Sequence, residues 1–233
     1  MRRRNLLFAS LATFTAPAAR AAAASPVVLE LFTSQGCSSC PPADALLGTL
    51  AQRPGVIALA WHVDYWNRLG WLDPFASREA TARQKAYARQ LRSEVFTPAL
   101  VIGGADVVVG SDRGAVERAI QSAQPLRVPV TFSRTRDGTA VAVGNSQTPL
   151  RALSILYDPE HTTNIGAGEN GGARLHEYRI VRRVDSLGDW DGSSRQFVLP
   201  AAGIGQGQVV LVQSPDLQVV GAAERPPLDN KPS

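Results

Sequence analysis

Residues 32–44, FTSQGCSSCPPAD, contain the only two cysteines of the 233-residue chain. Cys37 and Cys40 are spaced C-x-x-C, and two prolines follow them directly. The apolar run at residues 27–33 predicts a buried strand before the cysteines, and prolines are favoured in the first turn of a helix. The stretch therefore predicts a strand, a turn that carries both cysteines, and the start of a helix.

This arrangement suits a redox pair better than a structural clip. A disulfide that closes so short a loop stabilises a protein by roughly 2 kcal/mol in the chain-entropy model, against about 3 kcal/mol for a 15-residue loop. Backbone N–H groups at the helix start favour a thiolate. We therefore expect Cys37 to be the exposed nucleophile, and Cys40 to be the shielded cysteine that resolves the mixed disulfide.

Two other interpretations of the cysteine pair stay open. A metal site needs three or four ligands, and His62 is the candidate that would complete a Cys-Cys-His copper site with the two cysteines. The second alternative is a non-catalytic binding module, in which the disulfide is inert and a β domain in the second half of the chain recognises a partner. Redox chemistry needs only the two cysteines, so we expect neither a bound cofactor nor a metal.

Outward from the cysteines, the first half of the chain alternates between strands and helices. The patterns predict a helix after the prolines, a strand at 56–64, a helix from Ser77 to Leu91, short strands at 99–102 and 106–109, and a last helix from residue 111. Thr97 and Pro98 precede the strand at 99–102, which we expect beside the cysteine turn. A cis bond there would present the Thr97 backbone to an extended peptide, whereas a trans proline would simply begin the strand.

The pattern changes after Gln124–Pro125. Alternating apolar residues flank Asp137–Gly138, a pair typical of β-hairpin turns, and further strand-like runs follow. We therefore predict two domains, residues 26–125 with alternating strands and helices and residues 127–223 as an all-β sandwich. A loose tail is expected at residues 224–233.

Four segments carry a resemblance to known proteins: LELFTSQGCSSCPPAD, ALAWHVDYWNRLGWLDPFA, VFTPALVIGG and IGAGENGGARLHEYRIVRRV. Residues 27–124 resemble a thioredoxin-like domain, with Cys37-Ser38-Ser39-Cys40 as its redox motif and Thr97–Pro98 as its cis-proline. The longer pattern resembles exported bacterial thioredoxin-like proteins known only as a domain of unknown function. The resemblance implies export, and an α/β thioredoxin-like domain followed by an all-β sandwich-like domain. It implies no substrate, and the Ser-Ser dipeptide departs from thioredoxin itself.

Several aromatic and polar residues are candidates for supporting roles. Trp66 and Trp71, in a predicted loop, are candidates to line an apolar groove for a substrate. Glu30, His62 and Asp64 are candidates to relay a proton to the resolving cysteine. A hydrogen-bonded structural role is the alternative for each of these three.

Residues 166–171, GAGENG, match the G-x-G-x-x-G pattern of nucleotide-binding loops. Such a loop needs a helix directly after it, whereas the residues that follow, RLHEYRIVRRV, alternate as a strand does. We therefore predict a loop that faces the first domain, and no nucleotide site.

Residues 1–24 have the pattern of an export signal, with three arginines at residues 2–4, an apolar stretch at residues 6–14 and A-x-A sites. Arg3–Arg4 fits a twin-arginine leader, and an ordinary secretory leader stays open. The leader holds four arginines and no acid, so the rest of this chain of net charge +4 is near neutral, which argues against nucleic-acid binding. We expect a soluble, periplasmic mature protein.

Together these patterns predict an exported thiol–disulfide oxidoreductase that acts on protein or peptide thiols and disulfides. A reductase would need a supply of electrons from across the membrane. A membrane-bound electron donor or acceptor is therefore a further expected partner, and the direction of electron flow is left open by the sequence.

Overall fold

The computed structural model describes residues 25–136 and 138–227. The predicted export signal at residues 1–24, residue 137 of the predicted hairpin turn and residues 228–233 of the predicted tail lie outside the described residues. None of the helices within the described ranges is both long enough and apolar enough to cross a membrane.

The first half of the chain contains the predicted elements in the predicted order, with one additional 3-10 helix. They are β1 (Val27–Thr33), α1 (Pro41–Leu50), β2 (Val56–His62), the 3-10 helix η1 (Tyr65–Leu69), α2 (Arg78–Leu91), β3 (Ala99–Ile102), β4 (Asp106–Val109) and α3 (Arg113–Ser122).

Local signals explain where the helices begin. Two prolines occupy the first turn of α1, where a backbone N–H has no partner in the helix and its loss costs little. Ser77 Oγ accepts a hydrogen bond from Ala80 N at 3.0 Å at the start of α2. Asp112 Oδ1 accepts one from Ala115 N at 2.9 Å at the start of α3.

The second half of the chain consists of strands. They are β5 (Val130–Thr135), β6 (Gly138–Val143), β7 (Leu150–Asn164), β8 (Arg174–Trp190), β9 (Arg195–Val198), β10 (Gly207–Gln213) and β11 (Val219–Arg225). Strand β11 runs through Arg225, so the first residues of the predicted tail belong to the sheet. The runs ALSILYD, residues 152–158, and LHEYRIVRRV, residues 175–184, predict two of these strands, and β7 and β8 are longer than those runs.

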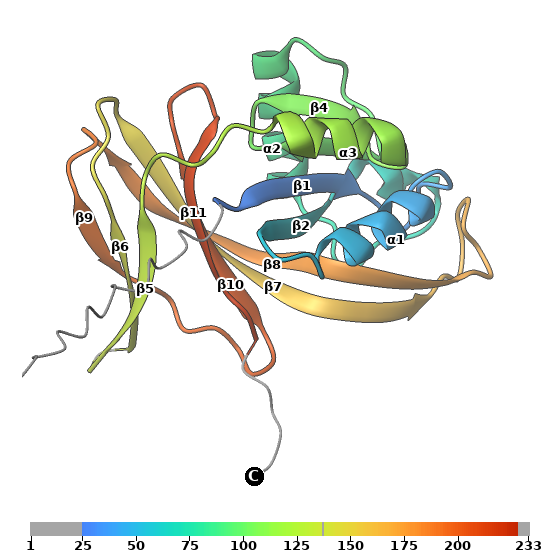
Figure 1. Cartoon of the computed structure of the whole chain (residues 1–233). Coiled ribbons are helices and arrows are strands. Elements are labelled where there is room, and N and C mark those ends of the chain that lie inside the picture. Colours follow the sequence, from blue (N-terminus) through green and yellow to red (C-terminus); the bar gives the residue numbers. More distant parts are fainter. Residues whose placement is uncertain (1–24, 137, 228–233) are drawn as a thin grey trace, which may run out of the picture.

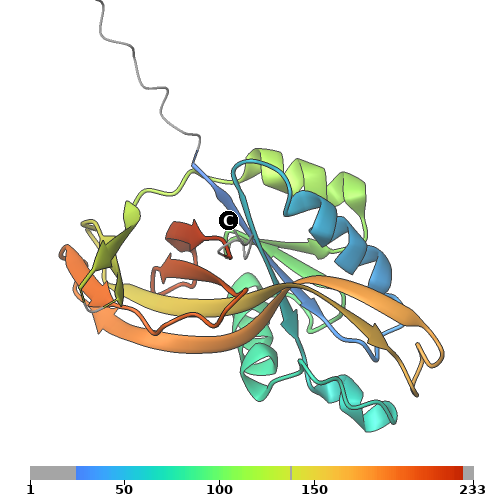
Figure 2. The same cartoon turned by 90° about the horizontal axis from the view of Figure 1, so that it is seen from below.

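Strands from both halves form one eight-stranded mixed sheet, in the order β11-β10-β7-β8-β2-β1-β3-β4. The two halves meet where β8 runs parallel to β2, with Ala60 opposite Ile180. Strands β5, β6 and β9 form a separate three-stranded sheet. The long strands β7 and β8 curve along the length of the molecule, from the three-stranded sheet to the end that carries α1 (Figures 1 and 2).

This topology corrects the predicted fold class. A thioredoxin-like α/β domain followed by a separate all-β sandwich is wrong, because the strands of the second half continue the sheet of the first. Alternation and turn signals are local: they identify β8 as a strand but do not show that its partner is β2. The same signals end the predicted strand before Pro159, although β7 continues to Asn164. The pairing of β7 with β10 ends at Tyr157, and a proline is tolerated beyond that point, at an edge.

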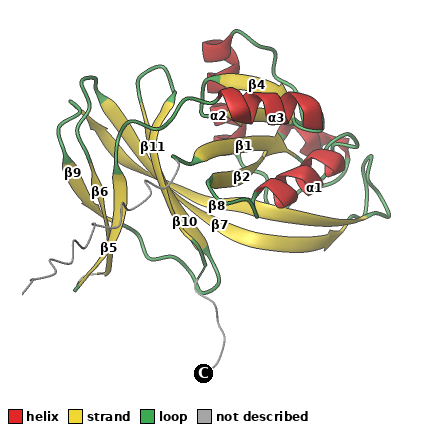
Figure 3. Cartoon of the chain, in the orientation of Figure 1, coloured by secondary structure: helices red, strands yellow, loops and turns green. Residues whose placement is uncertain are grey.

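Helices cover both faces of the part of the sheet formed by β1–β4, and the rest of the molecule is strands and loops (Figure 3). On one face, Leu29 and Leu31 of β1 pack with residues of α1 and α3. On the other face, Phe32 packs with Tyr87 of α2 in a core that also holds Leu211 of β10. This second core therefore joins the two halves of the chain.

Candidate functional site

Cys37 and Cys40 form a disulfide in the turn between β1 and α1. The turn is closed by hydrogen bonds from Cys37 N to Ser34 O at 3.1 Å and from Cys40 N to Cys37 O at 3.2 Å. Ser38 and Ser39 between the cysteines are exposed, whereas both cysteines are fully buried, at 0% exposure. The expectation of an exposed Cys37 is therefore wrong for this structure.

The segment before β3 brings a second predicted group to the disulfide. The Thr97–Pro98 bond is cis, and Thr97 Oγ1 lies within hydrogen-bonding distance of Cys37 Sγ, at 3.4 Å. Trp66 Nε1 donates to Thr97 Oγ1 at 2.9 Å. The structure thus places Thr97 beside the cysteine turn, as the sequence predicts, and adds Trp66 as a partner of Thr97. The functional roles of these residues stay predictions.

Gln35 is a residue of the site that sequence reasoning missed. Its backbone N donates to Asp73 Oδ2 at 2.9 Å, and its Nε2 donates to Glu177 Oε2 at 2.7 Å and to Thr163 Oγ1 at 3.0 Å. Its Oε1 accepts a hydrogen bond from Trp71 Nε1 at 2.9 Å. Trp71 therefore uses its polar edge to hold the cysteine turn, and its predicted place in a substrate groove stays a prediction.

His62 lies in a buried cluster of charged groups. Its Nδ1 is 2.7 Å from Asp73 Oδ2, and its Nε2 is 3.8 Å from Glu177 Oε1. Burial alone would lower the pKa of His62, but the neighbouring carboxylates outweigh burial and raise this pKa to about 9. Burial raises the pKa of Glu177, whereas the charge of His62 outweighs burial at Asp73 and lowers the pKa of that carboxyl. His62 is therefore an imidazolium ion at neutral pH, held by the Asp73 carboxylate.

Asp44 is a second residue that sequence reasoning missed. It lies one turn into α1, where its backbone N donates to Cys40 O at 3.1 Å, and its side chain is buried. Thr33 Oγ1 donates to Asp44 Oδ2 at 3.1 Å. Burial raises the pKa of Asp44 to about 7, and the charge of His62 offsets part of that effect. A carboxyl group with a pKa near neutral pH therefore lies in α1, one turn after Cys40. The sequence signal was an acid between apolar residues of α1.

Two other predicted proton relays have structural partners. Glu30 accepts hydrogen bonds from Arg83 Nε and from Tyr87 Oη, each at 2.6 Å, on the face of β1 opposite to α1. Asp64 Oδ1 accepts one from Thr81 Oγ1 at 2.6 Å, which ties the end of β2 to α2. Both side chains match the structural alternative stated for them, and a relay role stays a prediction.

The loop between β7 and β8, residues 165–173, lies over the cysteine turn, as predicted for a loop facing the first half of the chain. Glu169 Oε2 accepts hydrogen bonds from Ser38 N at 3.1 Å and from Ser38 Oγ at 2.7 Å. Asn170 Nδ2 donates to the carbonyl oxygens of Gln35 at 2.8 Å and of Cys37 at 3.0 Å. The β7–β8 loop therefore contacts both the backbone of Cys37 and the exposed Ser38 that follows it.

The glycines of this loop allow its close approach to Trp71. A Cβ atom on Gly166 would lie 3.1 Å from Trp71 Cζ3, and one on Gly168, whose φ is +75°, would lie 3.3 Å from Trp71 Cβ. Strand β8 follows the loop directly. The G-x-G-x-x-G match therefore reflects packing against a tryptophan in a strand–loop–strand context.

No group of three or more His, Cys, Asp or Glu side chains suited to a metal ion is found in the described part of the chain. For the copper alternative, the structure joins the two sulfur atoms to each other and places His62 against Asp73.

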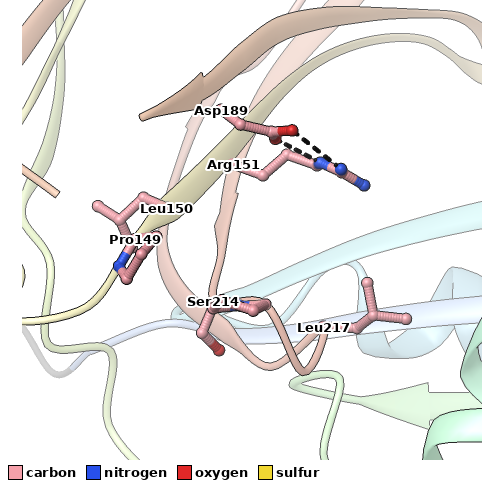
Figure 4. A pocket seen from close by; sticks show the side chains of 7 residues that line it. Pro149, Leu150, Arg151, Asp189, Ser214 and Leu217 are labelled. Carbon is pink, nitrogen blue, oxygen red and sulfur yellow. Dashed lines mark hydrogen bonds and ion pairs between the residues drawn. The ribbon is translucent and has the colours of Figure 1, made fainter. Parts of the chain in front are cut away.

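A cavity of about 280 Å³ lies elsewhere, between the ends of β7 and β8 and the β10–β11 turn (Figure 4). Arg151 and Asp189 are paired on its wall, with Arg151 Nε 2.6 Å from Asp189 Oδ1. None of the residues around the disulfide lines this cavity, so it is not part of the cysteine site.

The fold and the site together define a mixed α/β protein whose C-x-x-C disulfide is buried beneath a β-hairpin loop. Residues 28–213 match the family described as "Protein of unknown function (DUF1223)", and the chain belongs to this family. The part of the predicted resemblance that concerned a domain of unknown function is thereby confirmed, and the thioredoxin-like part is not.

Two solved structures resemble this chain. Protein AGR_C_4864 from Agrobacterium tumefaciens is 34% identical, with a TM-score of 0.77 over 91% of this chain and 99% of that chain. HBP35 of Porphyromonas gingivalis is 14% identical, with a TM-score of 0.57 over 91% of this chain and 80% of that chain, so this likeness concerns the fold alone. No curated protein matches the sequence.

Proposed function

We propose that this protein is a thiol–disulfide oxidoreductase that acts on protein or peptide thiols and disulfides through Cys37 and Cys40. The observation that carries the proposal is a C-x-x-C disulfide at the start of α1 with a hydroxyl group in contact with Cys37. Thr97 Oγ1 contacts Cys37 Sγ, and Asp44 lies one turn from Cys40. A disulfide with a purely structural role needs neither group.

In the oxidising direction, a substrate thiolate attacks Sγ of Cys37. A new S–S bond forms as the Cys37–Cys40 bond breaks, and the electron pair of the broken bond stays on Sγ of Cys40, which takes a proton. A second substrate thiolate then attacks the substrate sulfur of the mixed disulfide and releases Cys37 as a thiolate. The substrate dithiol loses two electrons and the cysteine pair gains two; the reducing direction runs the same steps backwards.

Asp44 and Thr97 have distinct parts in these steps. With a pKa of about 7, the Asp44 carboxyl donates a proton to Cys40 when the disulfide opens and accepts one when the disulfide closes. The Thr97 hydroxyl donates a hydrogen bond to the Cys37 sulfur and stabilises its thiolate. Neither step requires a bound cofactor.

The leader sequence supports export of this chain to the periplasm. There the cysteine pair must be returned to its starting state after each turnover, because one exchange leaves it reduced or oxidised. A membrane-bound electron donor or acceptor is therefore part of the proposal.

A redox titration tests the proposal. We expect the purified protein, equilibrated in dithiothreitol buffers and alkylated, to show a two-electron midpoint within the range of known exchange catalysts, about −270 to about −120 mV. A Cys40→Ser variant should trap a substrate through Cys37 as a mixed disulfide, while Cys37→Ser, its matched control, should trap far less. The proposed oxidoreductase activity would be refuted if the cysteine pair stayed oxidised at potentials below about −300 mV, or if both variants trapped substrate equally.

A further inference from the structure

The tip of the loop at residues 165–173 makes the polar contacts between this loop and the cysteine turn. Glu169 meets the exposed Ser38, and Asn170 meets the backbone of Gln35 and Cys37. The Glu169–Ser38 contacts lie on the surface, where water can replace either partner.

The base of the same hairpin is held more firmly than its tip. Thr163 and Glu177, on the two strands, both accept hydrogen bonds from Gln35 Nε2, and Gln35 and Glu177 are buried. The strand pairing continues to Asn164 opposite Arg174 and stops there. A hinge at the ends of the strands would let the tip move while the base stays in place.

The composition of the loop suits such a movement. Four of its nine residues are glycine, and Gly168 and Gly172 have φ values of +75° and +86°. Glycine crosses between backbone conformations at little steric cost. At the base of the loop, hydrogen bonds between Ile165 and Ala173 and between Gly172 and Ile165 close the turn.

We propose that residues 165–173 are a lid that closes the Cys37–Cys40 disulfide and must lift before a thiol can reach Cys37. An attacking sulfur needs a free approach to the sulfur it attacks, and Cys37 has no exposed surface while the loop is in this position. The biological use of the lid rests on the proposed oxidoreductase function. The closure itself can be tested without a biological substrate, from the rate at which a chemical reductant reduces the disulfide.

The contacts of the lid also indicate the class of substrate that replaces it. When the lid lifts, the Ser38 N–H loses an acceptor, and the Gln35 and Cys37 carbonyls lose a donor. An extended polypeptide carries both kinds of group along its backbone and can satisfy both. The exposed side chains of Leu69 and Leu72, in the segment that packs against the lid, add apolar surface. The substrate is therefore an unfolded or extended polypeptide rather than a small thiol.

The test is the rate at which excess dithiothreitol reduces the disulfide, followed by alkylation and mass measurement. Asn170→Ala and Glu169→Ala should each raise this rate about 2- to 10-fold, because each removes hydrogen bonds of the closed lid. Glu169→Gln keeps the size of the side chain, should raise the rate in the same direction, and covers a failure of the alanine variant to fold. Glu160→Ala is the matched control: it lies on the same hairpin, pairs with His176 at 3.3 Å, and should leave the rate unchanged.

Folded variants whose reduction rates stay within twofold of the wild-type rate would overturn the lid. Turnover of a reduced, unfolded protein substrate, measured on the same samples, separates this result from the proposed function. Faster reduction without turnover would support the lid proposal and contradict the proposed oxidoreductase function. Turnover with unchanged reduction rates would contradict the lid proposal alone.

Discussion

At the scale of single residues, Asp44 shows how burial can turn an ordinary side chain into a proton-exchanging group. In the unfolded chain its carboxyl has the ordinary pKa of 3.8, and in the fold burial raises this pKa to about 7. Between these values the folded chain holds a proton that the unfolded chain has released. The free energy of unfolding therefore falls as the pH rises from about 4 to about 7, and above pH 7 the charged Asp44 costs about 4 kcal/mol.

Asp44→Asn should remove this cost. The amide does not titrate and keeps an oxygen for the Thr33 hydroxyl, so the variant should be more stable than the wild type at pH 8, by as much as about 4 kcal/mol, and similar to it at pH 4. The same variant should slow thiol exchange about tenfold or more, because it removes the proton donor proposed for Cys40. Urea denaturation at both pH values gives the stabilities, with the exposed Asp106→Asn as control. If the free energy of unfolding changed with pH in the same way for the wild type and Asp44→Asn, the pKa of Asp44 would not be raised in the fold, and the carboxyl would be ionised at pH 7.

At the scale of elements, one guanidinium group of α2 contacts residues of several strands of the sheet. Arg83 donates to both carboxylate oxygens of Glu30, at 2.6 and 2.9 Å, and to Gln213 Oε1 at 3.1 Å. It also lies over the rings of Trp61 and Tyr87, at 4.9 and 5.0 Å from their centroids. A buried carboxylate in the middle of β1 is tolerated because this cation meets it directly.

Arg83→Met should destabilise the protein by about 3–5 kcal/mol, because it leaves the Glu30 carboxylate buried without a counter-charge. Replacing both residues, as Arg83→Met with Glu30→Gln, should recover part of the loss. Urea denaturation at pH 7 measures both effects. The matched control is Arg53→Met, which breaks a surface ion pair with Glu117 and should change the stability little. Equal losses for the two arginine variants would contradict the role assigned to burial.

The helices and strands also show which parts of the fold could be predicted from the sequence. Helix starts were predictable because their caps are local: Ser77 precedes α2 and Asp112 precedes α3. The cysteine turn and its neighbour Thr97 were predictable for a similar reason, since a short motif carries each. The pairing of β8 with β2 was not predictable, because a strand pattern does not identify a partner far along the chain.

The candidate site was predictable only in part, for the same physical reason. Glu169, Asn170 and Glu177 reach the cysteine turn from the β7–β8 hairpin, and only the topology brings them there. Gln35 was within the decisive stretch, but a glutamine between a strand and a turn carries no signal of its own. Its importance comes from partners in three segments that meet in the fold.

At the scale of the whole molecule, the continuous sheet raises the question of whether the halves unfold separately. Phe32 and Trp61 of the first half and Tyr157 and Leu211 of the second are buried in the same core. A side chain removed from β10 therefore leaves a cavity that residues of both halves border. Independent domains at residues 26–125 and 127–223 would not share such a core.

Leu211→Ala distinguishes these two behaviours. The truncation should cost about 2–5 kcal/mol, as expected for a fully buried leucine. Trp190 is the only tryptophan of the second half, so in a Trp190→Phe background fluorescence reports on the first half alone. If the sheet and core unfold as one unit, this fluorescence transition shifts to lower urea by the full cost of the truncation, together with the far-UV circular dichroism transition.

Val141→Ala, in the core beneath the three-stranded sheet, tests whether that sheet belongs to the same unit. A first-half transition that stays in place when Leu211 is truncated would mean that the halves unfold independently despite their shared sheet.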